Sequence, residues 1–133
     1  YDVIMLLDVL EHFEVEESIH LLRLSRDVLK NGGRLLIQVP CAHSPLSPHR
    51  YWDITHQRAY TIHSIAQCLS LAGFTQFESF TLGPVPHGIK SLTRWILWHI
   101  LINPIITAYM LAANSDSMGG IYTALMLTVA YKK

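Results

Sequence analysis

Three side chains that can bind a cation or move a proton stand close together near the start of the sequence. Asp8, Glu11 and His12 follow a short apolar run, where a turn is expected to lead into a helix. Residues three and four apart on such a turn face the same side. Two carboxylates and an imidazole on one side could hold a hard divalent cation such as Mg²⁺. The alternative is that Asp8 caps the turn, Glu11 is solvated and His12 acts as a base.

Two histidines are candidates for a catalytic general base, because imidazole titrates near neutral pH. They are His12 and His56. The chain contains eight histidines, and these cannot all be catalytic. An ordinary structural role for both residues is therefore the competing interpretation.

A long polar and aromatic loop is expected at residues 41–60. Its most informative members are His49, Arg50, Tyr51 and Trp52. A loop of this length in a compact domain is usually functional. Aromatic and Arg side chains could bind a sugar or a ring of a substrate, so these four residues are predicted to cover an acceptor pocket. The alternative is a packed surface loop with a buried Trp.

The elements that position these residues are predicted from the pattern of apolar side chains. Val3–Leu7 and Leu35–Val39 are short continuous apolar runs, typical of strands buried on both faces of a parallel sheet. Apolar residues at helical spacing indicate a helix between them, which residues 31–33 (Asn-Gly-Gly) end. Strand, helix and strand together predict one βαβ unit.

The remainder of the chain predicts a second helix and two more strands. Thr61 is expected to cap the helix, and Gly73 to end it. Gln76–Leu82 and Tyr122–Tyr131 are predicted as strands because they are enriched in Thr, Val and Tyr.

An apolar segment separates those two strands. Residues 95–115 contain no Asp, Glu, Lys or Arg, and their number is near that of a membrane-spanning helix. However, Pro104 should kink or split a helix here, and spanning would place the last two strands on opposite sides of a bilayer. We expect a broken helical hairpin within a helical insert at about 88–115, lying over the acceptor site or, through residues 89–113, on a membrane, since Trp95 and Trp98 suit an interface. A helix pair packed on its own domain or on a second copy is the alternative.

Composition excludes several classes of protein. The 133 residues fit one domain or part of one, and half of them are hydrophobic, so a packed core is expected. Ten acidic and ten basic side chains balance, and no basic run occurs, which argues against a nucleic-acid partner. Cys41 and Cys68 lack metal-ligand spacing and indicate a reducing, intracellular setting.

Three motifs in order resemble class I methyltransferases that depend on S-adenosylmethionine (SAM). Asp2–His12 resembles the fourth strand of that family and the Leu-Glu-His that follows it. Leu29–Pro40 resembles the family's turn into the fifth strand, with Asn31 in place of the usual Pro. Ala59–Phe74 is similar to the following helix and its Ala-Gly-Phe end. Together the motifs cover residues 1–83.

The resemblance implies an α/β fold: strands four to seven of a Rossmann-like, seven-stranded sheet, with helices on both faces and the last two strands antiparallel. It implies that Asp8, Val9 and Leu10 lie beside SAM, and that His12 or His56 serves as the base. The Asp8, Glu11 and His12 pattern is also similar to the Glu-x-x-Glu-His of Mg²⁺-dependent relatives, with Asp8 replacing the first Glu and His56 as the later histidine.

The family's Gly-rich loop and ribose-binding carboxylate hold most of the adenosine, and neither motif occurs in this sequence. Tyr1 also opens on a strand already under way. We therefore expect residues 1–133 to be the C-terminal half of one methyltransferase domain, with the N-terminal half as its partner. The chain alone should bind SAM poorly.

The predicted function is SAM-dependent methyl transfer to the oxygen, nitrogen or carbon of a small-molecule or lipid-linked acceptor. Two alternatives stay open. One is a non-catalytic interaction or membrane-docking module derived from the fold, and the other is a Mg²⁺-dependent enzyme built around Asp8, Glu11 and His12. The expected location is the cytoplasm, with contact to the inner face of a membrane as an extension of the hairpin hypothesis.

Overall fold

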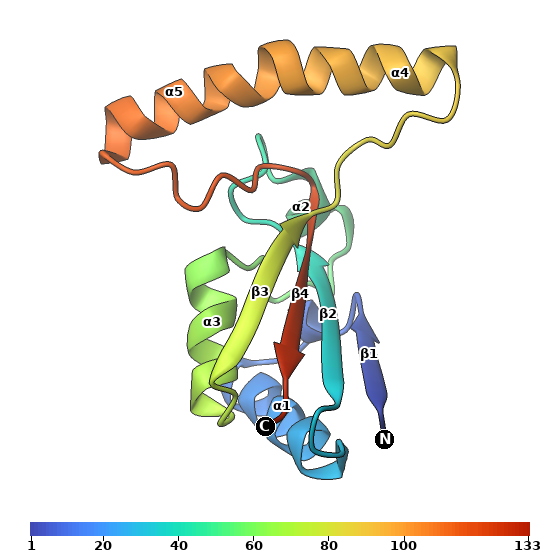
Figure 1. Cartoon of the computed structure of the whole chain (residues 1–133). Coiled ribbons are helices and arrows are strands. Elements are labelled where there is room, and N and C mark those ends of the chain that lie inside the picture. Colours follow the sequence, from blue (N-terminus) through green and yellow to red (C-terminus); the bar gives the residue numbers. More distant parts are fainter.

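A computed structural model describes all residues from 1 to 133 as one mixed four-stranded sheet with flanking helices (Figure 1). Element η1 is a 3₁₀-helix and η2 is a π-helix. The elements in chain order are β1 (Val3–Leu7), η1 (Leu10–His12), α1 (Val15–Val28), β2 (Arg34–Pro40), α2 (Pro48–Trp52), α3 (Ile62–Leu71), β3 (Gln76–Thr81), α4 (Ile89–Ile96), η2 (Leu97–Ile102), α5 (Asn103–Asn114) and β4 (Leu125–Tyr131).

The strand order across the sheet is β1-β2-β4-β3. β1 and β2 are parallel, and β4 runs antiparallel to both of its neighbours. The predicted antiparallel pairing of the last two strands is thus confirmed. β4 starts three residues later than expected, at Leu125. Before this strand, the Thr123 hydroxyl donates to the Leu125 carbonyl at 2.8 Å, and the Cys41 amide donates to the Ala124 carbonyl at 3.0 Å.

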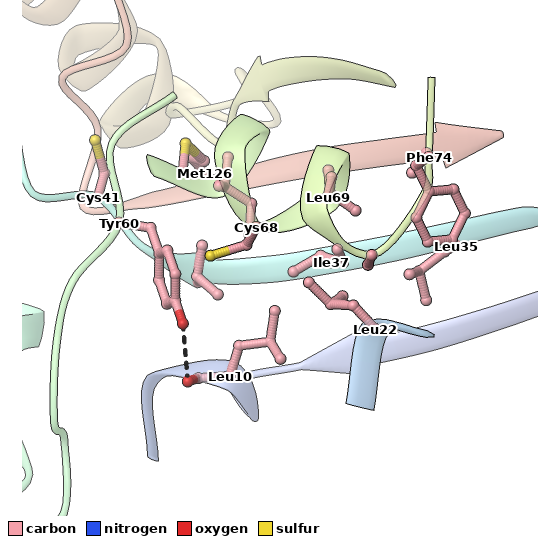
Figure 2. Close-up of a cluster of buried hydrophobic side chains, with 14 of the residues drawn as sticks. Leu10, Leu22, Leu35, Ile37, Cys41, Tyr60, Cys68, Leu69, Phe74 and Met126 are labelled. Carbon is pink, nitrogen blue, oxygen red and sulfur yellow. Dashed lines mark hydrogen bonds between the residues drawn. The ribbon is translucent and has the colours of Figure 1, made fainter. Parts of the chain in front are cut away.

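The core lies between one face of the sheet and the helices α1 and α3. Alternate residues of β2 point to it, because side chains of a strand alternate between faces. α1 and α3 both pack on this face and cap it with leucine and isoleucine side chains (Figure 2). Each such side chain contributes about 1.5–3 kcal/mol when fully buried. The members at the centre of this core are Leu22, Leu35, Ile37, Ile65 and Leu69.

The second face of the sheet is less covered than the sequence suggested. Val3, Met5 and Leu7 of β1 are about half exposed, so the prediction that this strand is buried on both faces is wrong for this chain. The resemblance implied helices on both faces, whereas α1 and α3 share one face here. β1 is also the edge strand, so its outer backbone groups have no strand partner, and its outward side chains lie on the face that α1 and α3 do not cover.

The ends of the elements follow the predicted local chemistry. The Thr61 hydroxyl accepts a hydrogen bond from the Ser64 amide at 3.0 Å and so caps α3. Gly73 follows the end of α3 with a φ of +93°, a left-handed conformation that glycine adopts without strain.

The apolar segment forms one continuous helix, α4–η2–α5, rather than the expected hairpin. Pro104 does not break it, because a π-turn precedes the proline: the Asn103 amide donates to the Trp98 carbonyl, five residues back. This wider turn relieves the clash that a proline ring makes with the carbonyl four residues earlier. The helix runs across the carboxyl ends of β1, β2 and β3 (Figure 1).

This helix, Ile89–Asn114, is long and apolar enough to cross a membrane, judged by length and composition alone. Its central part has no buried residue. Both of its ends return to the same end of the sheet (Figure 1).

Candidate active site at the carboxyl edge of the sheet

The site begins where β1 ends. Asp8 has a φ of +53°, which is uncommon for a residue other than glycine. Its amide still continues the ladder by donating to the Gln38 carbonyl at 3.1 Å. The Gln38 side-chain amide donates to both Asp8 carboxylate oxygens, at 3.0 and 3.1 Å. These bonds redirect the chain into η1 and fix the carboxylate at the edge of the sheet.

Buried residues of the core hold the turn that follows β1. Leu10 is fully buried, and its carbonyl accepts a hydrogen bond from the Tyr60 hydroxyl at 3.2 Å (Figure 2). The Ser18 hydroxyl lies 3.2 Å from the same Tyr60 oxygen. Val9 is half-buried and Asp8 is exposed. Of the three residues expected beside SAM, Leu10 can therefore offer only its backbone.

The long loop is tied to this turn through the backbone of Glu11. The Glu11 carbonyl accepts hydrogen bonds from the amides of Gln57 at 2.7 Å and Arg58 at 3.3 Å. These bonds place His56 beside His12, with ring centroids 4.8 Å apart and an edge-to-face angle of 68°. The structure thus brings together the two histidines that the sequence proposed as bases.

Both imidazoles are oriented by hydrogen bonds to Nδ1. His56 Nδ1 lies 2.7 Å from the His49 carbonyl oxygen. His12 Nδ1 lies 2.8 Å from the Thr55 hydroxyl, which in turn donates to Asp53 at 2.7 Å. Hydrogen bonds from the side chain and the backbone of Thr55 hold the pKa of Asp53 below its ordinary value.

The Glu11 carboxylate is fully buried between these groups. Neither of its oxygens has a hydrogen-bond partner in the protein. Burial raises the pKa of Glu11, and the nearby Asp8 carboxylate raises it further. The residue's own backbone amide, His12 and His56 lower this pKa, but burial has the largest effect. One potential ligand atom from each of Glu11, His12 and His56 lies within 4.8 Å of the others.

Of the predicted metal set, Glu11 and His12 lie in one close cluster with His56, the later histidine of the Mg²⁺-dependent pattern. Asp8 lines the same pocket but lies outside this cluster. The cluster thus offers two imidazoles and one carboxylate, whereas Mg²⁺ prefers oxygen ligands.

These groups line an open pocket of about 310 Å³ at the carboxyl edge. Of the residues predicted to cover an acceptor, His49 and Trp52 line it. Trp52 is 77 % exposed, so the alternative of a buried Trp is wrong. Arg50 instead donates to the carbonyls of His56 and Gln57 and so braces the loop. Tyr51 is exposed beside the Arg50 guanidinium.

The sequence did not single out two residues that hold this site together. Gln38 is a polar residue inside the apolar run of β2, and that irregularity was a usable signal. Thr55 carried no signal, because its role depends on the fold of α2 and the residues that follow it.

A second pocket, of about 490 Å³, lies between the long helix and the end of the sheet. Arg94, Trp98 and Ile102 of the helix form one wall. Residues of the β3 and β4 ends, among them Leu82 and Tyr122, form the other. The inner face of the helix thus covers the same edge of the sheet at which His12 and His56 lie.

Comparisons with solved structures give the same architecture. The chain is similar to a SAM-dependent methyltransferase from Archaeoglobus fulgidus, with 17 % identity and a TM-score of 0.63 over 98 % of this chain and 59 % of that one. It is also similar to a SAM-dependent methyltransferase from Thermotoga maritima (12 % identity, TM-score 0.60, 99 % and 56 % of the two chains). A third similar structure is phosphoethanolamine N-methyltransferase 2 from Haemonchus contortus in complex with SAM (17 % identity, TM-score 0.57, 99 % and 33 %).

At these identities the likeness establishes the fold alone. The chain spans between about a third and three fifths of the length of these methyltransferases. A sequence comparison with curated proteins gives no match.

The family model of a methyltransferase domain matches residues 1–78, more than half of the chain. The match contains β1, the turn with Glu11 and His12, β2 and the loop with His56. The chain therefore belongs to the methyltransferase domain family, with the class I fold of SAM-dependent methyltransferases.

Proposed function

We propose that the protein transfers a methyl group from SAM to an acceptor held at the carboxyl edge of the sheet, and that this acceptor is lipid-linked. The observation that supports methyl transfer is the pocket itself. Two oriented imidazoles and three carboxylates lie at the carboxyl ends of the strands, where open α/β sheets bind their ligands. SAM supplies an activated methyl group, so the protein mainly has to align an acceptor with it.

The residues of this chain fit both tasks. Asp8 is exposed at the end of β1 and is held there by Gln38, so it can contact the cofactor from the edge of the sheet. Nδ1 of His12 and of His56 is engaged in a hydrogen bond within the site, so Nε2 is the nitrogen through which either neutral ring could take a proton from an oxygen or nitrogen acceptor. His49 and Trp52 offer rings against which the acceptor can stack.

The support for a lipid-linked acceptor comes from the helix α4–η2–α5. A large exposed apolar surface on a helix normally marks a contact with a partner or with a lipid surface. Here nine large apolar side chains of the helix are exposed, and each would gain up to about 1.5–3 kcal/mol on full burial. They are Ile89, Leu92, Ile96, Leu97, Ile100, Leu101, Ile105, Tyr109 and Leu111.

The connections of the helix favour a position in the plane of the membrane surface over a spanning one. Both ends are tethered to the same end of the sheet (Figure 1). A spanning helix would draw one connection through the hydrocarbon layer, where an irregular backbone has no hydrogen-bond partners. Residues 121–123 of the second connection are instead buried against the domain. Lying flat, the helix would bring the pocket beneath it to the lipid surface, and Lys90 and Arg94 would attract anionic lipids.

One experiment tests the reaction and its acceptor class. The protein, expressed from its complete reading frame, is incubated with SAM carrying a radiolabelled methyl group and an extract of cell membranes. Transfer of the label to the organic phase is the expected result. Label in water-soluble products alone would refute the lipid-linked acceptor and keep methyl transfer, whereas no enzyme-dependent label in either phase would refute the proposed reaction.

Flotation with anionic phospholipid vesicles tests the membrane contact separately. Asp substitutions at Ile100 and Ile105 should release the protein from the vesicles, because they place charge on the exposed apolar surface of the helix. The matched control is Leu71→Asp, a similarly exposed apolar residue on α3, which should float as the unmodified protein does. Equal flotation of the helix variant and the control would contradict docking through this helix.

A further inference from the structure

The cluster of Glu11, His12 and His56 has a chemical property that acid–base catalysis alone does not require. All three groups can act as metal ligands, with one potential ligand atom from each within 4.8 Å of the others. No hydrogen bond joins the Glu11 carboxylate to either imidazole. The hydrogen bonds around the cluster show how this arises.

For His56 the tautomer follows from its partner. A carbonyl oxygen can only accept, so Nδ1 of His56 must carry the proton that it donates to the His49 carbonyl at 2.7 Å. Nε2 of the neutral ring is then an acceptor. The same pattern, with Nδ1–H bonded to a backbone carbonyl and Nε2 free, is the usual state of a histidine that binds a metal.

For His12 the tautomer follows through a relay. The Thr55 hydroxyl has a single proton, and Asp53, whose carboxylate can only accept, lies 2.7 Å away. Thr55 therefore donates to Asp53 and accepts from His12 Nδ1 at 2.8 Å. In the neutral ring, Nε2 of His12 is then an acceptor as well. A carboxylate behind the hydroxyl strengthens this orientation, as outer-shell carboxylates do behind metal-binding histidines.

The buried carboxylate of Glu11, the third member of the cluster, is the strongest indication that the cluster binds a cation. The Glu11 side chain is fully buried, and neither carboxylate oxygen has a hydrogen-bond partner in the protein. A buried carboxylate without a partner is strongly unfavourable, and proteins normally pair such a group or use it to coordinate a metal. No Lys or Arg lines this pocket, so no side chain of the pocket supplies a permanent positive charge.

We propose that Glu11, His12 and His56 bind one divalent transition-metal ion of the Zn²⁺ class. Two imidazoles and one carboxylate form a known ligand set for zinc, with further positions open to water or a substrate. The ligands of a tetrahedral Zn²⁺ ion lie about 3.4 Å apart, given metal–ligand distances near 2.1 Å. The cluster therefore has to contract by up to about 1.4 Å to bind the ion.

With the ion bound, His12 and His56 act as ligands in place of the base role proposed above, because a nitrogen that binds the ion cannot also accept a proton. The proposal does not depend on methyl transfer, because metal binding can be measured directly. The protein is expressed from its complete reading frame, stripped with a chelator and titrated with ZnCl₂ in a calorimeter. Metal content after dialysis is measured by mass spectrometry. The expected result is one Zn²⁺ per chain, which an excess of MgCl₂ does not displace.

Matched variants assign the site. Glu11→Gln and His56→Gln should each weaken zinc binding by at least about 100-fold, because each removes a ligand. Thr55→Val should weaken it by about 10-fold, because it frees the His12 ring without removing a ligand. The control is His87→Gln, which removes an exposed imidazole outside the cluster and should leave the affinity unchanged.

Two results would overturn the proposal. One is the absence of stoichiometric zinc binding by the unmodified protein. The other is unchanged affinity in His56→Gln and Thr55→Val, which would mean that zinc binds at other surface histidines. Thermal unfolding of each variant shows whether it is folded, and the Thr55 and His56 variants keep the test decisive if removal of the buried Glu11 carboxylate prevents folding.

Discussion

The hydroxyl of Tyr60 connects the core to the turn that carries Glu11 and His12, and its removal gives a quantitative test of the structure. Tyr60→Phe deletes one buried oxygen and keeps the ring, so the packing seen in Figure 2 is preserved. The Leu10 carbonyl loses its 3.2 Å bond and keeps the 3.3 Å bond from the Phe13 amide and the 3.4 Å contact with the Ser18 hydroxyl. Burial raises the pKa of Tyr60, so its phenol stays protonated throughout the neutral range.

The expected loss of unfolding free energy is about 0.5–1.5 kcal/mol. A net intramolecular hydrogen bond contributes about this much, and no penalty for an unsatisfied carbonyl is added because the Phe13 amide and the Ser18 hydroxyl still donate to Leu10. With a urea m-value of about 2 kcal/mol per molar, the unfolding midpoint should fall by about 0.5 M at an unchanged m-value. Urea unfolding followed by fluorescence at pH 7.5 measures this shift.

Tyr131→Phe is the matched control, because Tyr131 is only half-buried and its hydroxyl makes no hydrogen bond to a side chain or carbonyl of the domain. Its unfolding free energy should change by no more than about 0.5 kcal/mol. If both variants unfold at the same urea concentration as the unmodified protein, the hydroxyl of Tyr60 does not hold the Leu10 carbonyl, and the anchoring of the site by the core is refuted.

Two further predictions concern stability. Gly33→Ala should destabilise the protein by about 1–3 kcal/mol, because its new methyl group would lie 2.8 Å from the Lys30 carbonyl oxygen; Gly88→Ala meets no atom within 4 Å and should change the urea midpoint little. His43 has its pKa lowered from 6.5, first by burial and then by the nearby His63, so the unfolded chain binds more protons and stability should fall as the pH drops below about 6.5. His43→Gln should reduce this loss between pH 7 and pH 5, and identical pH profiles of the two proteins would contradict it.

The sequence alone determined the local elements of this fold. The apolar runs at β1 and β2 and the Thr61 cap follow from residue type and spacing, because strand pattern, caps and left-handed glycines depend on near neighbours in the chain. The antiparallel final pair was implied by the resemblance to class I methyltransferases. The adjacency of Glu11 and His12 was fixed in the same way. These features were sufficient to indicate the family and to point to the carboxyl edge of the sheet as the site.

Only the tertiary structure decided the composition of the site and the form of the apolar segment. His56 reaches Glu11 and His12 because the Glu11 carbonyl binds two amides of a distant loop, and no local pattern encodes such a bond. Asp8 lies outside the cluster because the side chain of Gln38, on the neighbouring strand, donates hydrogen bonds to its carboxylate. The helix continues through Pro104 because the wider π-turn before it makes room for the proline ring, although helix propensity alone predicts a break. Long-range hydrogen bonds and the geometry of one turn thus overrode local preference, since their partners meet only after the chain has folded.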